Sequence, residues 1–390
     1  MSMDTQSPPK LALQGADVLT PQGWLSDATV LIDEGRFVAV DQTPKPSGYI
    51  GLDVSGLRLV PGIVDIHGDA FERKICPRPG VTQPLPMAMV ENDRALLAAG
   101  ITTFFYSITD SFEPGLRSRA TARSIVEYVY GEVGKSLLAD SRIHIRHEQA
   151  NTAHFEELCD WLQTGQVNLL SLNDHLPPSL DDDSLHRYTK GMRQRIKVSD
   201  DEVRAIVRAA MDQREAGLQQ LEDLVMLAHQ VEVPVASHDD ETAEDVATSR
   251  RRQVAIAEFP ASIDLAAQSR AYGAAVLMGA PNLVRGGSHV GYMGVTDAVE
   301  AQVLDCLCSD YHYPSLFYAP FKLVALGLME LAQAWKLVSE YPARAAGLGD
   351  CKGAIAPGYA ADALLLRPET QFHDGISAVY IGGREVARYG

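Results

Sequence analysis

The sequence predicts a distorted (β/α)8 TIM barrel with a small β-sandwich domain that is built from both termini. Three observations lead to this fold class. Eight short apolar segments that resemble strands follow one another through the middle of the chain, and helical sequence separates many of them. Both ends of the chain are rich in short β-like segments with turns. The length of 390 residues allows one large domain and one small domain, because α/β barrels commonly occupy about 250 residues.

The two ends of the chain share a pattern of β-branched alternation interrupted by turn residues. In the first sixty residues this pattern runs through KLALQGADVLT, ATVLIDEGRFVAVDQ and GLRLVPG. In the last forty residues it returns in GAIAPGYAADALLLRP and SAVYIGGREVARYG. The shared turn chemistry favours one joint domain over two separate flaps. We therefore assign residues 1–60 and 353–390 to the β domain and residues 61–352 to the barrel.

The predicted barrel strands are LVPGIVDIHG, GITTFFYSI, RIHIRHE, VNLLSLND, VPVASHD, VAIAEFP, AAVLMGA and DCLCSDY. The clearest helices are SRATARSIVEYVYGEV, DDEVRAIVRAAMDQREAGLQQLEDLVMLAHQ and SIDLAAQSRAYG. The first begins with a serine and the second with paired aspartates, which are typical of helix N-termini. A doubly wound sheet is the alternative fold, but no G-x-G-x-x-G motif follows an early strand.

Charge and cysteine content exclude several classes of protein. The chain has 34 Lys and Arg against 51 Asp and Glu, so its net charge is −17, and its pI is near 5.0. This balance argues against nucleic acid or an anionic membrane as the main partner. No apolar stretch reaches the ~18–20 residues of a membrane span, and the N-terminus lacks the features of a signal peptide. Five scattered cysteines fit a reducing compartment, so we expect a cytoplasmic protein.

Side chains that can bind metals recur where the predicted strands end. The first strand ends in DIHGD, and strand alternation places Asp65, His67 and Asp69 on one face. The other candidates, each at the end of a later strand, are Glu148, His175, His238 and Asp310. In a barrel these strand ends meet at the face that carries the active site.

Imidazole and carboxylate ligands together suit Zn²⁺, Mn²⁺ or Fe²⁺ better than Mg²⁺ or Ca²⁺. The six expected ligands, which exceed the needs of one tetrahedral ion, are His67, Asp69, Glu148, His175, His238 and Asp310. We therefore expect two divalent metal ions, zinc first with manganese or iron as alternatives, with Glu148 as the bridging ligand. Such ions make hydroxide available near neutral pH, which points to hydrolysis. Asp310 is the candidate base for the proton of the attacking water.

The motifs around these ligands resemble the amidohydrolase superfamily, in PGIVDIHGD (61–69), in GITT (100–103) and in the two-part β domain. A closer resemblance is to its phosphonate-catabolism branch, the α-D-ribose 1-methylphosphonate 5-triphosphate diphosphatases. This resemblance rests on PRP (77–79), ASHDD (236–240), IAEFP (256–260), LMGAPN (277–282), VRGGSH (284–289) and SDY (309–311). It implies a binuclear centre at the six ligands and release of pyrophosphate from a ribose triphosphate. Asp69 stands where the superfamily usually has a second histidine, and Glu148 falls one strand earlier than the usual bridging acid.

A polyphosphate substrate needs local cations, which bind phosphate oxygens. The candidate substrate-binding residues are Arg187, Lys190, Arg193 and Arg195 after the fourth strand, Arg285 after the seventh and Arg78 after the first. His289 is a candidate catalytic residue that protonates a leaving group or contacts a phosphoryl oxygen. Each of these residues also has a plainer interpretation, as part of a solvated helix, a tight turn or a structural contact.

Two other functions stay open. An amidohydrolase or deaminase acting on a C–N bond would use the same centre with a neutral, mostly apolar pocket. An interaction scaffold would be expected to lack metal ligands, whereas all six candidates are present. We expect a small-molecule anionic phosphorylated substrate, no nucleic acid and no membrane as partner, and the sequence is compatible with a homo-oligomer.

Overall fold

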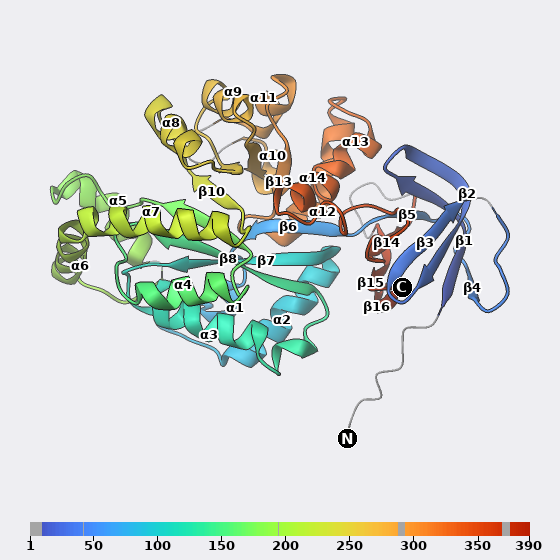
Figure 1. Ribbon diagram of the computed structural model, residues 1–390, viewed down its shortest axis with the longest axis horizontal. Coiled ribbons are helices and arrows are strands. Elements are labelled where there is room, and N and C mark those ends of the chain that lie inside the picture. The colour runs from blue at the N-terminus through green and yellow to red at the C-terminus, as the bar shows by residue number, and fades with distance from the viewer. Residues whose placement is uncertain (1–9, 42, 194, 288–292, 369–374) are drawn as a thin grey trace.

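The computed structural model describes residues 10–41, 43–193, 195–287, 293–368 and 375–390. Figure 1 shows a barrel of parallel strands flanked by helices, with a separate sheet beside it that contains strands from both ends of the chain. This arrangement confirms the predicted fold class. The division at residues 60/61 and 352/353 stays a prediction; in the described part of the chain, the strands of the small sheet lie within residues 11–61 and 363–388.

The terminal sheet has eight strands in mixed orientation. Its strands are β1 (Leu11–Thr20), β2 (Gly23–Asp33), β3 (Arg36–Asp41), β4 (Ile50–Asp53), β5 (Arg58–Pro61), β14 (Ala363–Leu366), β15 (Ile376–Ile381) and β16 (Arg384–Arg388). Antiparallel pairing of β5 with β14 joins the two ends of the chain, with Val60 opposite Leu364. Inward-facing side chains such as Leu13, Phe37 and Tyr380 bury a core of its own. The prediction of one joint β domain is therefore confirmed.

The barrel contains eight parallel strands, and all eight segments predicted from the sequence form them. They are β6 (Ile63–Gly68), β7 (Ile101–Asp110), β8 (Asp140–Glu148), β9 (Leu169–Asn173), β10 (Val235–His238), β11 (Ile256–Glu258), β12 (Ala275–Gly279) and β13 (Cys306–Cys308). The last strand returns to the first through hydrogen bonds just beyond their ends. The Asp69 N–H donates to the Asp310 carbonyl at 2.9 Å, and the Asp310 N–H donates to the His67 carbonyl at 3.0 Å.

Helices connect the strands and cover the barrel (Figure 1). They are α1 (Glu72–Ile75), α2 (Leu85–Ala98), α3 (Arg119–Tyr130), α4 (Phe155–Gln163), α5 (Asp182–Arg193), α6 (Asp200–Asp212), α7 (Arg214–Gln230), α8 (Ala243–Arg251), α9 (Ile263–Ala271), α10 (Ala280–Arg285), α11 (Val295–Glu300), α12 (Tyr313–Ala325), α13 (Leu331–Lys336) and α14 (Glu340–Ala345). Two 3₁₀ turns, η1 (Gly115–Arg117) and η2 (Gly134–Ser136), lie in the loops. Ser118 caps α3, as the sequence predicted, and Ser262 caps α9. Helix α6 begins with the predicted pair of aspartates, after the cap Ser199.

The long helix predicted between the fourth and fifth strands is divided in the structure. It breaks at Gln213 into α6 and α7, because the two halves pack on different surfaces. Helix α6 packs with α5 in a separate apolar cluster, whereas α7 buries Leu221 and Leu224 against the barrel. Gly217 permits the close approach of α7, since a Cβ there would lie 2.0 Å from the Gln149 carbonyl oxygen. Helices α5 and α6 consequently project away from the terminal sheet (Figure 1).

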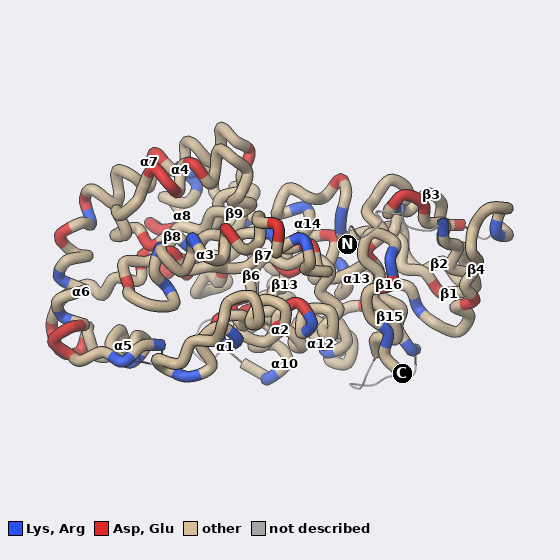
Figure 2. The backbone as a smooth tube through the Cα atoms, turned by 90° about the horizontal axis from the view of Figure 1, so that it is seen from below, with Lys and Arg blue, Asp and Glu red and all other residues tan. Residues whose placement is uncertain are grey.

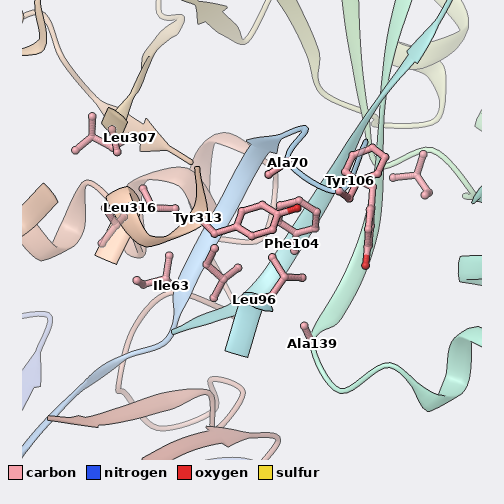
Figure 3. Close-up of a cluster of buried hydrophobic side chains, with 14 of the residues drawn as sticks. Ile63, Ala70, Leu96, Phe104, Tyr106, Ala139, Leu307, Tyr313 and Leu316 are labelled. Carbon is pink, nitrogen blue, oxygen red and sulfur yellow. The ribbon is translucent and has the colours of Figure 1, made fainter. Parts of the chain in front are cut away.

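An aromatic cluster fills the space between the first two barrel strands and α12. Figure 3 shows the ring of Phe104 between those of Tyr106 and Tyr313, and the ring centroids lie 4.8 and 5.3 Å apart. Asn92 accepts a hydrogen bond from the Tyr313 hydroxyl at 2.8 Å, so the polar tip of this ring is satisfied inside the core.

All five cysteines are unpaired. Among the described helices, none has the length and apolar character needed to cross a membrane.

Trp335 connects α13 to the junction between β5 of the terminal sheet and β6 of the barrel. It is fully buried, and its indole N–H donates to the Pro61 carbonyl at 2.9 Å. Replacing Trp335 with Ala should lower the free energy of unfolding by about 3–5 kcal/mol, because the change leaves a large cavity. Trp335→Phe keeps most of the ring and should cost less. Chemical denaturation measures both variants, and equal midpoints for Trp335→Ala and the unaltered protein would contradict this role.

Candidate metal centre

A cavity of about 240 Å³ opens at the carboxyl ends of the barrel strands. Its lining contains four of the six predicted metal ligands, which are His67, Asp69, His238 and Asp310. The hydrogen bonds that close the barrel place the residues of the first and last strands side by side. Asp65, expected on the same face, is completely buried below the cavity, where its Oδ1 accepts the Ser309 N–H at 3.1 Å.

The rings of His67 and His238 stack face to face, with centroids 5.4 Å apart and an interplanar angle of 13°. Phe259 packs edge-on against both rings, at 4.9 and 5.3 Å. Beneath them lies Glu258, a buried carboxylate at the end of β11 that sequence reasoning did not identify. Its Oε1 lies 2.8 Å from His67 Nδ1, and its Oε2 lies 3.1 Å from His238 Nδ1.

His175 joins the centre from the loop after β9. Its ring centroid lies 5.4 Å from that of His238. Its Nδ1 lies 2.5 Å from Oε1 of Glu148, and its backbone N–H donates to Oε2 of the same residue at 3.1 Å. Burial opposes ionisation of Glu148, but the charge and hydrogen bonds of His175 hold its pKa at about 2. Glu148 is thus an ionised partner of His175, and its predicted role as a bridging ligand stays a prediction.

Asp239 supplies a further carboxylate that was not predicted as a ligand. Its Oδ2 lies 3.7 Å from His175 Nε2 and 3.6 Å from His238 Nε2. Ligand atoms around a tetrahedral zinc ion, with bonds of about 2.1 Å, are about 3.4 Å apart. These three side chains therefore fit a divalent ion of this kind, both in donor chemistry and in spacing. The sequence signal that could have identified Asp239 was its position beside His238 in ASHDD.

Three residues at the strand ends have left-handed backbone conformations. Asp239 follows β10 with φ 56°, Phe259 follows β11 with φ 56°, and Asp310 lies just after β13 with φ 52°. Residues other than glycine rarely adopt this region, and the strain costs on the order of 1 kcal/mol or more. Such strain clusters at functional sites. Here each turn follows directly on a strand that ends at the candidate centre.

A buried ionic network fixes the ends of β7 and β8. Asp110 bonds the Arg119 guanidinium through both of its oxygens, at 2.5 and 2.7 Å. Its Oδ2 also lies 2.7 Å from His147 Nδ1, and its Oδ1 accepts from Asn151 at 3.0 Å. These contacts hold the strand that carries Arg146 and Glu148, the neighbours of His147 in sequence.

Two arginines that were not predicted as site residues line the 240 Å³ cavity. Arg146, on β8, places one guanidinium nitrogen 2.9 Å from His238 Nε2 and another 3.7 Å from Asp69 Oδ2. Arg117, in η1, lies 3.8 Å from Asp69 Oδ2 and forms an ion pair with Glu72 at 3.0 Å. Strand alternation relates Arg146 to Glu148, two residues later, and this was the signal that could have identified it.

The predicted substrate-binding cations lie elsewhere among the described residues. Lys190 and Arg193 line a separate cavity of about 600 Å³ between α5 and α6, and Arg193 pairs with Asp200 at 2.7 Å. Arg195 pairs with Glu113 at 2.7 Å. Arg78 and Arg285 are exposed in loops after β6 and at the end of α10. The backbone of Arg187 lies in α5, and His289 falls outside the described residues.

Comparisons with known proteins agree with this architecture. The model of the amidohydrolase family matches residues 58–386. The chain is 32% identical over 361 residues to α-D-ribose 1-methylphosphonate 5-triphosphate diphosphatase of Escherichia coli (strain K12), which covers 90% of this chain and 93% of the relative.

Solved structures with a similar fold include molinate hydrolase, with a TM-score of 0.65 at 13% identity, covering 98% of this chain and 95% of that one. They also include dihydropyrimidinase from Brevibacillus agri, with a TM-score of 0.61 at 16% identity, covering 97% of this chain and 95% of that one. At such identities the likeness supports the fold alone.

Asp65 should make stability depend on pH. Its complete burial raises the pKa of the carboxyl to about 6. The unfolded chain ionises this group near 3.9, so the folded state loses stability as pH rises from about 4 to about 6. Two pKa units correspond to about 3 kcal/mol. Asp65→Asn should therefore gain up to that much stability relative to the unaltered protein between pH 4 and pH 7. Urea denaturation of both chelator-treated proteins at several pH values measures this difference in the free energy of unfolding. A difference that stays constant with pH would show that Asp65 does not titrate in this range.

Proposed function

The chain belongs to the amidohydrolase family, and on that premise we propose that it is a metal-dependent diphosphatase. It hydrolyses a phosphoanhydride of α-D-ribose 1-methylphosphonate 5-triphosphate, or of a related ribose triphosphate, and releases pyrophosphate in phosphonate catabolism. The observation that carries this proposal is the 32% identity, over 90% of the chain, to a relative named for that activity. The donor set at the strand ends supports it, because it suits divalent metals.

The candidate metal ligands are the three imidazoles and the neighbouring carboxylates. We infer two divalent ions, zinc first with manganese or iron as alternatives, held by His67, Asp69, His175, His238, Asp239 and Asp310, with Glu148 as the predicted bridge. When bound, such ions make hydroxide available near neutral pH and offset negative charge on phosphoryl oxygens. Side chains of the protein bind and orient the substrate and transfer the proton.

Asp310 is the proposed general base. Burial, together with the nearby charge of Asp69, raises the pKa of its carboxyl to about 6. A carboxylate with a pKa close to the working pH accepts a proton from the attacking water and still releases it readily. Gly279 keeps the space beside this carboxylate open, since a Cβ there would lie 3.1 Å from Asp310 Oδ2.

Arg146 and Arg117 are the proposed phosphate-binding cations at the centre. Both line the cavity that holds Asp310, and guanidinium groups bind phosphoryl oxygens in pairs. A second cavity of about 750 Å³ adjoins the centre through His175, His238 and Asp239, and leaves room for the rest of a ribose triphosphate. Binding of the departing polyphosphate by Arg187, Lys190, Arg193 and Arg195, with Arg78 and Arg285, stays a prediction.

Asp310→Asn should lower kcat for pyrophosphate release by about 10²–10⁴-fold, the usual contribution of a general base, and leave the metal content near that of the unaltered protein. A panel of ribose and nucleoside triphosphates identifies the substrate, and elemental analysis gives the metal content. Removal of metal with a chelator should abolish turnover, and divalent metal should restore it. A variant that keeps most of its turnover would remove Asp310 from the mechanism. Turnover of C–N substrates in place of triphosphates would favour an amidohydrolase or deaminase.

Arg117→Ala should lower kcat/KM for the triphosphate by about 10–100-fold, because the loss of one charge-assisted hydrogen bond is worth about 1.5–3 kcal/mol. Arg251→Ala is the matched control, since Arg251 is exposed on α8 and pairs with Glu244. Steady-state kinetics at constant ionic strength compare the two variants. Equal kcat/KM values would show that Arg117 does not bind the substrate. Arg193→Ala in the same assay tests the contribution of α5.

A further inference from the structure

Glu258 is a buried carboxylate whose polar contacts all come from other barrel strands. Its Oε1 contacts His67 Nδ1, from β6. Its Oε2 contacts His238 Nδ1, from β10, and accepts the Ser171 hydroxyl, from β9, at 2.8 Å. The side chain has no exposure to solvent. Glu258 thus connects two candidate metal ligands to each other from below the cavity.

The chemistry of these contacts fixes where the imidazole protons lie. An ionised carboxylate only accepts hydrogen bonds, so Nδ1 of His67 and Nδ1 of His238 must both donate. Two imidazole nitrogens and the Ser171 hydroxyl converge on the two oxygens of Glu258, and an ionised carboxylate can accept from all three. A neutral imidazole that carries its proton on Nδ1 has its lone pair on Nε2.

His144 is a third imidazole near Glu258, but it has a different partner. Its Nδ1 lies 3.0 Å from the Ile66 carbonyl oxygen, which can only accept, so this nitrogen donates. Its Nε2 lies 3.8 Å from Glu258 Oε1, which is too far for a hydrogen bond. The two nitrogen donors to Glu258 are therefore His67 and His238.

The same arrangement recurs at the third histidine of the centre. His175 directs Nδ1 to Glu148, and its Nε2 lies on the side of Asp239. His238 also presents Nε2 to Asp239, at 3.6 Å. In each case a buried glutamate contacts Nδ1, and Nε2 lies on the side of Asp239, where the Arg146 guanidinium also approaches His238 Nε2 to 2.9 Å.

We propose that Glu258 is the positioning residue of the metal centre: one carboxylate fixes the ring orientation and the Nδ1–H form of both His67 and His238, so that both offer Nε2 as ligand atoms. This inference rests on the proposed metal centre, and it makes Glu258 a partner of the ligands and not a ligand itself. Ligation through Oε2 would displace either His238 Nδ1 or the Ser171 hydroxyl, because this oxygen already has two hydrogen-bond partners, and the displaced buried donor would be unsatisfied. Partners of this kind typically change metal affinity by 10–100-fold.

Glu258→Gln tests the proposal with little change in shape. The glutamine amide presents an NH₂ donor where one carboxylate oxygen stood, so one of the two imidazoles loses its acceptor. We expect the dissociation constant for Zn²⁺, measured on the full chain by competition with a chelator, to increase by about 10–100-fold. ¹⁵N NMR of the metal-free proteins should show Nδ1–H for both His67 and His238 in the unaltered chain, and a change in at least one of them in the variant.

Asp93→Asn is the matched control. Asp93 is also buried, but it accepts the backbone N–H groups of Leu138 and Ala139, just before β8 begins, at the opposite end of the barrel. This variant should lower Tm and leave the affinity for Zn²⁺ unchanged. Equal loss of affinity in both variants would reduce the role of Glu258 to general stability and overturn the proposal.

Two further results would overturn the proposal. One is a proton on Nε2 of His67 or His238 in the unaltered metal-free chain. This can be measured by ¹⁵N NMR even if Glu258→Gln fails to fold. The other is a cobalt(II) absorption spectrum of Glu258→Gln that shows one carboxylate ligand fewer, since Glu258 would then be a ligand. None of these measurements uses pyrophosphate release. A chain that binds metal but leaves triphosphates intact would contradict the proposed reaction and not this inference.

Discussion

Closure of the barrel between its first and last strands is the constraint on which the candidate site depends. The two hydrogen bonds that join Asp69, Asp310 and His67 through the backbone bring the two ends of the barrel sequence, more than two hundred residues apart, to one edge of a cavity. The other strands then deliver His175, His238 and Asp239 to the same face, because parallel neighbours all end there. Without this closure the same residues would line the two separated edges of an open sheet.

Much of the fold was predictable, because strand and helix periodicity are local signals. All eight barrel strands and the joint terminal sheet follow from apolar alternation and turn residues, and four predicted ligands line one cavity. The contacts between strands were less predictable. Glu258 lies on a strand of three residues among apolar neighbours, and only the packing of β6, β9 and β10 around it reveals its partners. The break at Gln213 likewise depends on which surface each helix covers.

The acidic net charge of the chain is compatible with the proposed anionic substrate because charge is arranged locally. Figure 2 shows acidic and basic residues interspersed along α5 and α6, where Arg193 and Arg204 pair with aspartates. At the strand ends, by contrast, carboxylates face imidazoles and the guanidinium groups of Arg117 and Arg146. The bulk charge of −17 therefore describes the whole chain, and the balance in the cavity is set by a few side chains.

In the proposed centre, buried glutamates contact Nδ1 of His67, His175 and His238, and Nε2 of each histidine is the ligand atom. Anomalous diffraction from crystals grown with Zn²⁺, recorded on both sides of the zinc absorption edge, tests it most directly. We expect metal peaks at bonding distance from Nε2 of His67, His175 and His238, with Glu258 still hydrogen-bonded to Nδ1 of His67 and of His238. A metal peak at bonding distance from Glu258, or at Nδ1 of any of the three histidines, would contradict it.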